Sequence, residues 1–253
     1  MDYIKTIDEF PLLSVFESRW EAFQRDFTVL KRHFKLGSHT SNKSIVGQVR
    51  GFSYFLHGKT IPEMIALGFR HPDWSDEQLP QIQQSFEATL AMPEIAESMD
   101  FLRGIQDELG LISVYFSSMK PSARFTVHFN DDPYMYRGHL GLTIPSGDIG
   151  LQVCDTVVKW QQGKVFVFDT LNAHRAWNLS EEERTVLIID FYRPEADRAA
   201  MQALEAEQLT ERLAQDKASF GFSGGSKQEQ VTDEIKRRYG TEPTRIFRWD
   251  EAA

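Results

Sequence analysis

Cysteine is almost absent from the sequence, since Cys154 is the only one among 253 residues. One thiol can neither form an intramolecular disulfide nor supply the several thiolates of a zinc knuckle. The first ten residues, MDYIKTIDEF, contain no basic segment followed by an apolar one, so they do not resemble a secretion signal. No apolar run approaches the roughly 20 residues that span a bilayer. We therefore expect a cytoplasmic protein with no membrane partner.

Positive charge is also scarce. The chain has 28 Lys and Arg against 37 Asp and Glu, which gives a net charge of −9 and a pI near 5.3. An acidic surface repels nucleic-acid phosphates and anionic lipids, so we expect no nucleic-acid partner. Hydrophobic residues make up 41% of the chain and aromatic residues 12%, enough to build the core of one large domain.

Short β-forming runs separated by turn residues fill the sequence from Leu111 to Tyr192. We predict eight strands there: Ile112–Ser117, Arg124–His128, Tyr136–Ile144, Gly150–Val153, Val157–Trp160, Val165–Phe168, Ala173–Trp177 and Thr185–Tyr192. This density of short strands is typical of a compact antiparallel barrel or a two-sheet jelly roll. The mouth of such a barrel is a common place for a small-molecule site.

Helical patterns flank these strands on both sides. Before them we predict helices Ser18–Phe34, Ser75–Leu90 and Pro93–Leu109 and a strand Val46–Leu56; after them we predict helices Glu195–Ala218 and Lys227–Tyr239. The organisation expected is a domain of residues 1–194, with a helical part to about residue 110 and a β core from about 111 to 194. Residues 195–253 form a helical extension that either packs on this core or makes a homodimer contact.

Histidines in the strand-rich region suggest a metal site. His128 and His174 lie at strand ends, and two neutral imidazoles with open coordination positions suit a non-haem Fe(II) that reacts with O2. Such sites usually add a carboxylate two residues after the first histidine, where this chain has Asn130. Arg184 leads into an apolar strand, and if buried it needs an anionic partner such as a small dicarboxylate. Position alone leaves open that both histidines are structural and that Arg184 is solvated.

Residues from about Ser117 to Pro194 resemble the aspartyl/asparaginyl β-hydroxylases. The pattern that carries the resemblance is His128, Arg137-Gly-His139-Leu-Gly-Leu142, Pro145, Cys154, Trp160, Gly163-Lys164, Phe168-Asp169, His174, Asn178, Arg184, Asp190 and Pro194. The resemblance implies a mainly β fold with flanking helices, built on a double-stranded β-helix (a cupin-like jelly roll). It also implies a dioxygenase that uses Fe(II), 2-oxoglutarate and O2 and releases succinate and CO2.

The resemblance also implies roles for single residues. His128 and His174 match the two iron-binding histidines, with His139 as a second choice for the first of them. Arg184 and Ser117 match the pair that grips the distal carboxylate of 2-oxoglutarate, and Arg137 and His139 match a basic pair beside its other end. The family has a glycine where this chain has Asn130. Whether Asn130 ligates iron, bonds an iron-bound water or turns away is therefore open.

The substrate side departs from the family. Met135 stands where the aspartyl hydroxylases have a further arginine, and with Tyr134 and Tyr136 it forms an aromatic patch that either faces the substrate or packs internally. We expect hydroxylation of an unactivated C–H in a small molecule such as an amino acid, a short peptide or a natural-product intermediate. The alternatives are desaturation, cyclisation or halogenation with the same cofactors, and a non-catalytic cupin-like binding module. Phe129, Phe168 and Trp177 are candidates for the apolar walls of the site, and each could equally be an ordinary core residue.

Overall fold

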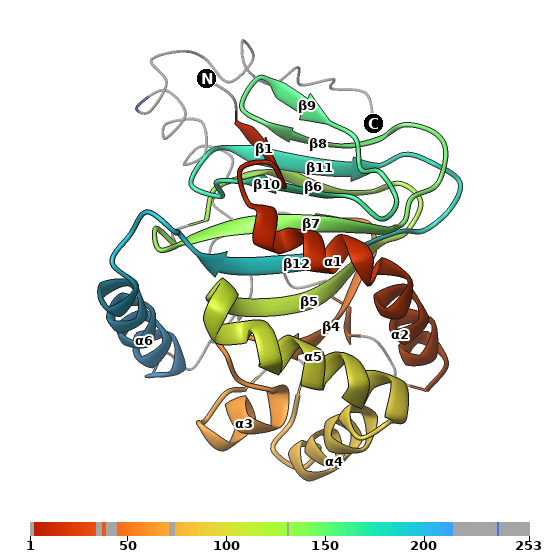
Figure 1. Ribbon diagram of the computed structural model, residues 1–253. Helices are drawn as coiled ribbons and strands as arrows, with labels where there is room; N and C mark the ends of the chain where they lie inside the picture. Colours follow the sequence, from red (N-terminus) through yellow and green to blue (C-terminus); the bar gives the residue numbers. More distant parts are fainter. Residues whose placement is uncertain are drawn as a thin grey trace.

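Two antiparallel β-sheets packed face to face form the centre of the computed structural model (Figure 1). The structure describes residues 3–33, 37–38, 45–70, 74–130, 132–214 and 237. The larger sheet has the strand order β1-β10-β7-β12-β5-β4-β2, and the smaller sheet has the order β3-β6-β11-β8-β9. Every pairing within the two sheets is antiparallel.

The strands are β1 Ile4–Thr6, β2 Gly37–Ser38, β3 Ile45–Val46, β4 Val49–Phe55, β5 Leu111–Met119, β6 Ala123–His128, β7 Met135–Thr143, β8 Ile149–Val153, β9 Thr156–Val158, β10 Val165–Phe168, β11 His174–Asn178 and β12 Arg184–Tyr192. The helices are a short 3-10 turn at Pro11–Leu13, α1 Ser14–Ser18, α2 Trp20–His33, α3 Ile61–Ala66, α4 Leu79–Leu90, α5 Pro93–Leu109 and α6 Arg198–Ala214.

All eight strands predicted between Leu111 and Tyr192 are present, each within two residues at either end. They form the two sheets of a double-stranded β-helix, so the predicted fold class is confirmed. The single strand predicted at Val46–Leu56 is wrong, because the chain breaks into β3 and β4, which belong to different sheets. Gly47 lies at the break with φ +84°, and a Cβ there would approach the Cα of Ala123 to 2.8 Å.

Strand alternation gives the larger sheet two buried faces. On β5, Val114 and Phe116 pack toward the helices, whereas Tyr115 and Met119 point between the sheets. The outer face carries the larger apolar cluster and is covered by α1, α2 and α5 (Figure 1). Side chains on the inner face therefore meet the smaller sheet and are shielded from solvent.

Two of the predicted N-terminal helices begin later than expected. α5 has the predicted bounds, with Pro93 in its first turn and the left-handed Gly110 (φ +63°) at its end. α2 begins at Trp20, and α4 begins at Leu79 rather than Ser75. Ser75 instead belongs to a turn in which its backbone N–H donates a hydrogen bond to Gln78 Oε1. The short elements β1, α1 and α3 were not predicted.

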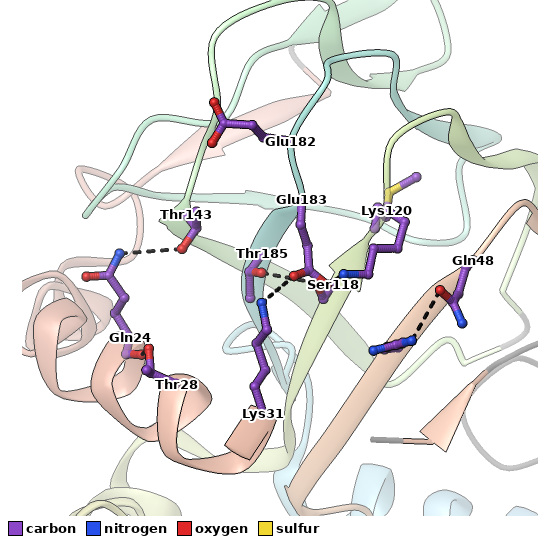
Figure 2. A network of polar contacts seen from close by, with 12 residues as sticks. Gln24, Thr28, Lys31, Gln48, Ser118, Lys120, Thr143, Glu182, Glu183 and Thr185 are labelled. Atoms are coloured by element: carbon purple, nitrogen blue, oxygen red, sulfur yellow. Dashed lines mark hydrogen bonds and ion pairs between the residues drawn. The ribbon is translucent and has the colours of Figure 1, made fainter. Parts of the chain in front are cut away.

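A polar network joins α2 to the start of β12 (Figure 2). Glu183, which immediately precedes β12, forms ion pairs with Lys31 on α2 (2.5 Å) and with Lys120 (3.2 Å). One residue further, Thr185 Oγ1 donates to Ser118 Oγ over 3.2 Å. These contacts fix where β12 begins, and Arg184 lies between Glu183 and Thr185.

The C-terminal part of the described chain packs on the barrel. On α6, Met201 and Leu204 contact a buried cluster that includes Ile112 and Tyr192, and Leu209 belongs to the helix-side core. The second predicted helix, Lys227–Tyr239, lies outside the described residues apart from one position. None of the described helices has the length and apolar character needed to cross a membrane.

Candidate active site

His128 and His174 lie side by side on the smaller sheet. His128 ends β6, His174 begins β11, and the two are ladder partners with ring centroids 4.2 Å apart. The Nδ1 of each ring lies 2.7–2.8 Å from a backbone carbonyl oxygen two residues earlier, that of Thr126 or Asn172. A carbonyl only accepts, so each Nδ1 carries the proton. Each Nε2 is thereby left with its lone pair, the usual arrangement of a metal-binding histidine.

Both histidines are neutral at neutral pH. Burial lowers the pKa of His128 to about 4, helped by the charge of Arg137. Burial and the neighbouring His128 hold the pKa of His174 well below its usual range. Neutral imidazole is the protonation state that binds a metal ion, so the pair fits a transition metal.

Among the residues that the structure describes, the pair has no third ligand of the usual kind nearby. Over the described ranges, no group of three or more His, Cys, Asp or Glu residues could hold a metal ion. Asn130 is 3% exposed, and its backbone N–H donates to the carbonyl of Thr170 over 3.0 Å. It is not among the residues that line the adjoining cavity. Ligation by Asn130 therefore stays a prediction.

A cavity beside the histidines brings together six of the seven residues expected to bind iron and cosubstrate, all except Asn130. It lies between the two sheets and has an empty volume of about 380 Å³, including solvent at its mouth. Its lining comprises Ser117, Phe125, His128, Arg137, His139, Leu151, Phe168, His174, Ala176, Arg184 and Ile188. The smaller sheet contributes the histidine pair, and the larger sheet contributes the other four predicted polar residues.

Arg184 is a buried cation without a carboxylate partner among the described residues. Arg184 is only 1% exposed. Its Nη1 donates a hydrogen bond to the carbonyl of Ser117 over 3.2 Å, and its Nη2 contacts the sulfur of Met119. The guanidinium carbon lies 4.3 Å from the ring centroid of Trp160, and Nε has no hydrogen-bond partner in the described part of the chain. Burial lowers the pKa of Arg184 to about 9. Such a cation is stabilised when an anion enters the cavity.

His139 presents a hydrogen-bond donor to the same interior. Trp160 Nε1–H donates to His139 Nδ1 over 3.1 Å, which places the remaining proton of the neutral ring on Nε2. That Nε2 is buried and has no partner in the described structure. Trp160 thus contacts both His139 and Arg184. No role was predicted for Trp160, although it belongs to the family pattern.

Arg137 is paired within the protein. Its Nε and Nη2 donate to the two carboxylate oxygens of Asp190 over 2.7 and 2.9 Å, and both residues are at most 5% exposed. Burial alone would lower the pKa of Arg137, but the adjacent carboxylate outweighs it and raises that pKa. Arg137 lines the cavity with its charge balanced, so among the cavity-lining residues the unbalanced cation is Arg184.

The expected substrate patch does not line the cavity. Tyr134 is fully buried beside Met135 under α6. Tyr136 packs on the helix side, and its hydroxyl donates to Glu195 over 2.6 Å. Strand alternation explains the position of Tyr136, because Tyr136 and Arg137 project from opposite faces of β7. The internal packing alternative therefore describes these side chains in the structure, and a substrate role for them stays a prediction.

One of the three expected aromatic walls lies where it was predicted. Phe168 lines the cavity, with its ring 5.3 Å from that of His174. Phe129 is buried outside the lining, and Trp177 projects to the other face of the smaller sheet, where it donates to Asp148 over 2.7 Å. Sequence reasoning missed the other apolar walls, which are Phe125, Leu151, Ala176 and Ile188.

The chain is similar to proteins of a known family. Residues 17–194, more than half of the chain, match the family model described as "Aspartyl/Asparaginyl beta-hydroxylase". The ornithine lipid ester-linked acyl 2-hydroxylase of Rhizobium tropici is 34% identical over 92 residues, covering 36% of this chain and 33% of that protein. The human aspartyl/asparaginyl β-hydroxylase is 28% identical over 93 residues, covering 37% of this chain and 12% of that protein. The matches thus span a third or less of either relative.

Among solved structures, a Pseudomonas putida prolyl-4-hydroxylase matches with a TM-score of 0.37 and 14% identity. The match covers 72% of this chain and 98% of the prolyl-4-hydroxylase chain. A 2OG-Fe(II) oxygenase family protein from Burkholderia pseudomallei gives a TM-score of 0.36 with 14% identity, covering 68% of this chain and 80% of its own. With the family model matched over residues 17–194, the chain belongs to the aspartyl/asparaginyl β-hydroxylase family.

Proposed function

We propose that the protein is an Fe(II)- and 2-oxoglutarate-dependent dioxygenase that hydroxylates an unactivated C–H bond. The observation that carries the proposal is the pairing, within one cavity, of two neutral histidines with a buried arginine that no described carboxylate balances. The reaction consumes substrate, 2-oxoglutarate and O2 and yields hydroxylated substrate, succinate and CO2, so the two oxygen atoms of O2 enter the two organic products.

Each cavity residue has a separate task in this proposal. His128 and His174 would hold the iron through Nε2, and the metal supplies the activation of O2 that organic side chains cannot provide. Arg184, with Ser117 beside it, binds the distal carboxylate of 2-oxoglutarate. His139 donates from Nε2 to an oxygen of the same molecule. Phe168 and the apolar walls keep water away from the reacting groups.

The substrate is proposed to be a small molecule with an uncharged reacting group. Arg137 is matched by Asp190, and Met135 replaces the arginine expected for an aspartyl substrate. The names of the relatives suggest two other classes, the acyl chain of a lipid and the side chain of a protein. Product mass separates the reaction outcomes: a gain of one oxygen indicates hydroxylation, a gain of chlorine indicates halogenation, and a loss of two hydrogens indicates desaturation or cyclisation.

Arg184→Met tests the function, because methionine keeps the length of the side chain and removes its charge. Loss of a charge-assisted, buried carboxylate contact worth about 3 kcal/mol predicts a roughly 100-fold weaker affinity for 2-oxoglutarate. Calorimetry on Fe(II)-loaded protein without O2 measures the affinity, and succinate release measures turnover. Arg50→Met, on β4 outside the cavity, is the matched control and should bind 2-oxoglutarate normally.

Two results together would refute the proposal. The first is that the wild-type protein forms no succinate from 2-oxoglutarate with Fe(II), with or without added substrates. The second is that His128→Ala leaves iron binding unchanged. The chain would then be better described as a cupin-like binding module.

A further inference from the structure

Tyr115 carries a buried hydroxyl that has no hydrogen-bond partner among the described residues. The residue is 6% exposed and lies on β5, two positions before Ser117 and therefore on the same, inner face of the larger sheet. Most buried hydroxyls in folded proteins are hydrogen-bonded, so an isolated one needs a physical reason. Phenylalanine would fill the same space without this unfavourable group.

The position of Tyr115 in the sheet relates it to the cavity. Ile188 on β12 is the ladder partner of Tyr115 on one side and of His139 on the other. Tyr115 and His139 thus flank Ile188; Ile188 and His139 line the cavity, whereas Tyr115 lies beside it. The Nε2 of His139 is likewise buried and without a partner in the described structure. Two unsatisfied donors therefore border the same wall from opposite sides.

The Tyr115 ring lies beside the Arg137–Asp190 ion pair, and the carboxylates of Asp190 and Asp132 also act on its hydroxyl. The guanidinium carbon of Arg137 lies 5.9 Å from the centroid of the Tyr115 ring, and the Asp190 carboxylate already bonds that arginine in a bidentate pair. Burial raises the pKa of the Tyr115 phenol, so the hydroxyl keeps its proton at neutral pH and can donate it in a hydrogen bond. A ligand carboxylate lying over Ile188 would accept from Tyr115 and His139 together.

We infer that Tyr115 is a cosubstrate-binding residue whose hydroxyl donates a hydrogen bond to a carboxylate oxygen of 2-oxoglutarate, opposite His139. The inference rests on the proposed function and adds to it a donor that the family pattern did not indicate. In the ligand-free protein the buried hydroxyl lacks a hydrogen bond, which is unfavourable. When the cosubstrate binds, the hydroxyl gains this bond, so the unfavourable free energy of burying it is offset only in the complex.

Tyr115→Phe tests this inference through two readouts that move in opposite directions. The melting temperature of the metal-free, ligand-free variant should stay equal to that of the wild type or rise, because an unsatisfied buried group is removed. The Kd for 2-oxoglutarate, measured by calorimetry on Fe(II)-loaded protein without O2, should rise about tenfold. Tyr192→Phe is the control: its hydroxyl bonds Glu205 away from the cavity, so its melting temperature should fall while its Kd stays unchanged.

An unchanged Kd in Tyr115→Phe overturns the inference. A weaker affinity accompanied by a lower melting temperature of the ligand-free protein also overturns it, because the hydroxyl would then have a partner within the protein. If the wild-type protein itself binds no 2-oxoglutarate, the proposed function fails and the inference fails with it. Normal binding by both the wild type and Tyr115→Phe removes only the role of Tyr115.

Discussion

Replacing Asp190 by asparagine should destabilise the protein strongly, although the two side chains have nearly the same shape. Asp190 is 4% exposed, and its carboxylate receives two hydrogen bonds from Arg137, which is 5% exposed. Removing one partner of a buried ion pair typically costs about 3–5 kcal/mol, because the other charge stays buried without compensation. The amide oxygen of asparagine can still accept one of the two hydrogen bonds, which favours the lower end of that range.

A loss of about 3 kcal/mol corresponds to a fall in melting temperature of roughly 6–12 °C for a domain of this size. Thermal and denaturant unfolding of the metal-free protein would measure it, since neither requires a cosubstrate. A double-mutant cycle with Arg137→Met isolates the interaction, because methionine removes the charge that Asp190 balances. The double variant should be more stable than the sum of the single losses predicts, by about 2 kcal/mol.

Two results together would refute the reasoning. Asp190→Asn would lower the free energy of unfolding by less than about 1 kcal/mol, the range expected for a solvated ion pair, and the effects in the double-mutant cycle would be additive. Those results would mean that water reaches the pair. The charge of Arg137 would then not be balanced by Asp190, and Arg137 would be available to an anionic substrate.

Three further predictions test other parts of the structure. Trp160→Phe removes the N–H that fixes His139, so calorimetry should show about five- to tenfold weaker 2-oxoglutarate binding. Burial raises the pKa of Asp26 above its ordinary 3.8, so the folded protein binds the proton more tightly than the unfolded chain and loses stability as pH rises from about 4. Thermal unfolding of the wild type and of Asp26→Asn across pH 4–8 measures this, and the variant should lack the loss. Gly141→Ala should cost about 3 kcal/mol in denaturant unfolding, because its Cβ would lie 2.2 Å from the carbonyl oxygen of Gln161.

The strands of the barrel could be predicted because their signal is local. Runs such as Val165–Phe168 are short, β-branched or aromatic, and bounded by turn residues, and this run has the bounds predicted. β1 has only three residues and is held by its pairing with β10, so its own sequence contains too little periodicity to identify it. The break at Gly47 depends on the backbone of Ala123, which is 76 residues away in the sequence.

The contacts of the candidate site could not be predicted in the same way. The family pattern indicated Arg137, His139 and Arg184, but their partners depend on the register between strands that are distant in sequence. Arg137 meets Asp190 across the β7–β12 ladder, and His139 receives its hydrogen bond from Trp160, 21 residues later. Composition and spacing do not encode that register, so whether each cation is balanced became visible only in the structure.

The balance of charge links the two halves of the cavity. The Asp190 carboxylate neutralises Arg137, and the histidine pair is neutral, so the lining residues leave one unbalanced positive charge on Arg184. 2-Oxoglutarate carries two negative charges, and burying the second without a partner would be unfavourable. A divalent cation at His128 and His174 would supply the missing positive charge. The charge balance therefore favours one binding site, with the histidine pair at one end and Arg184 at the other, over two separate sites.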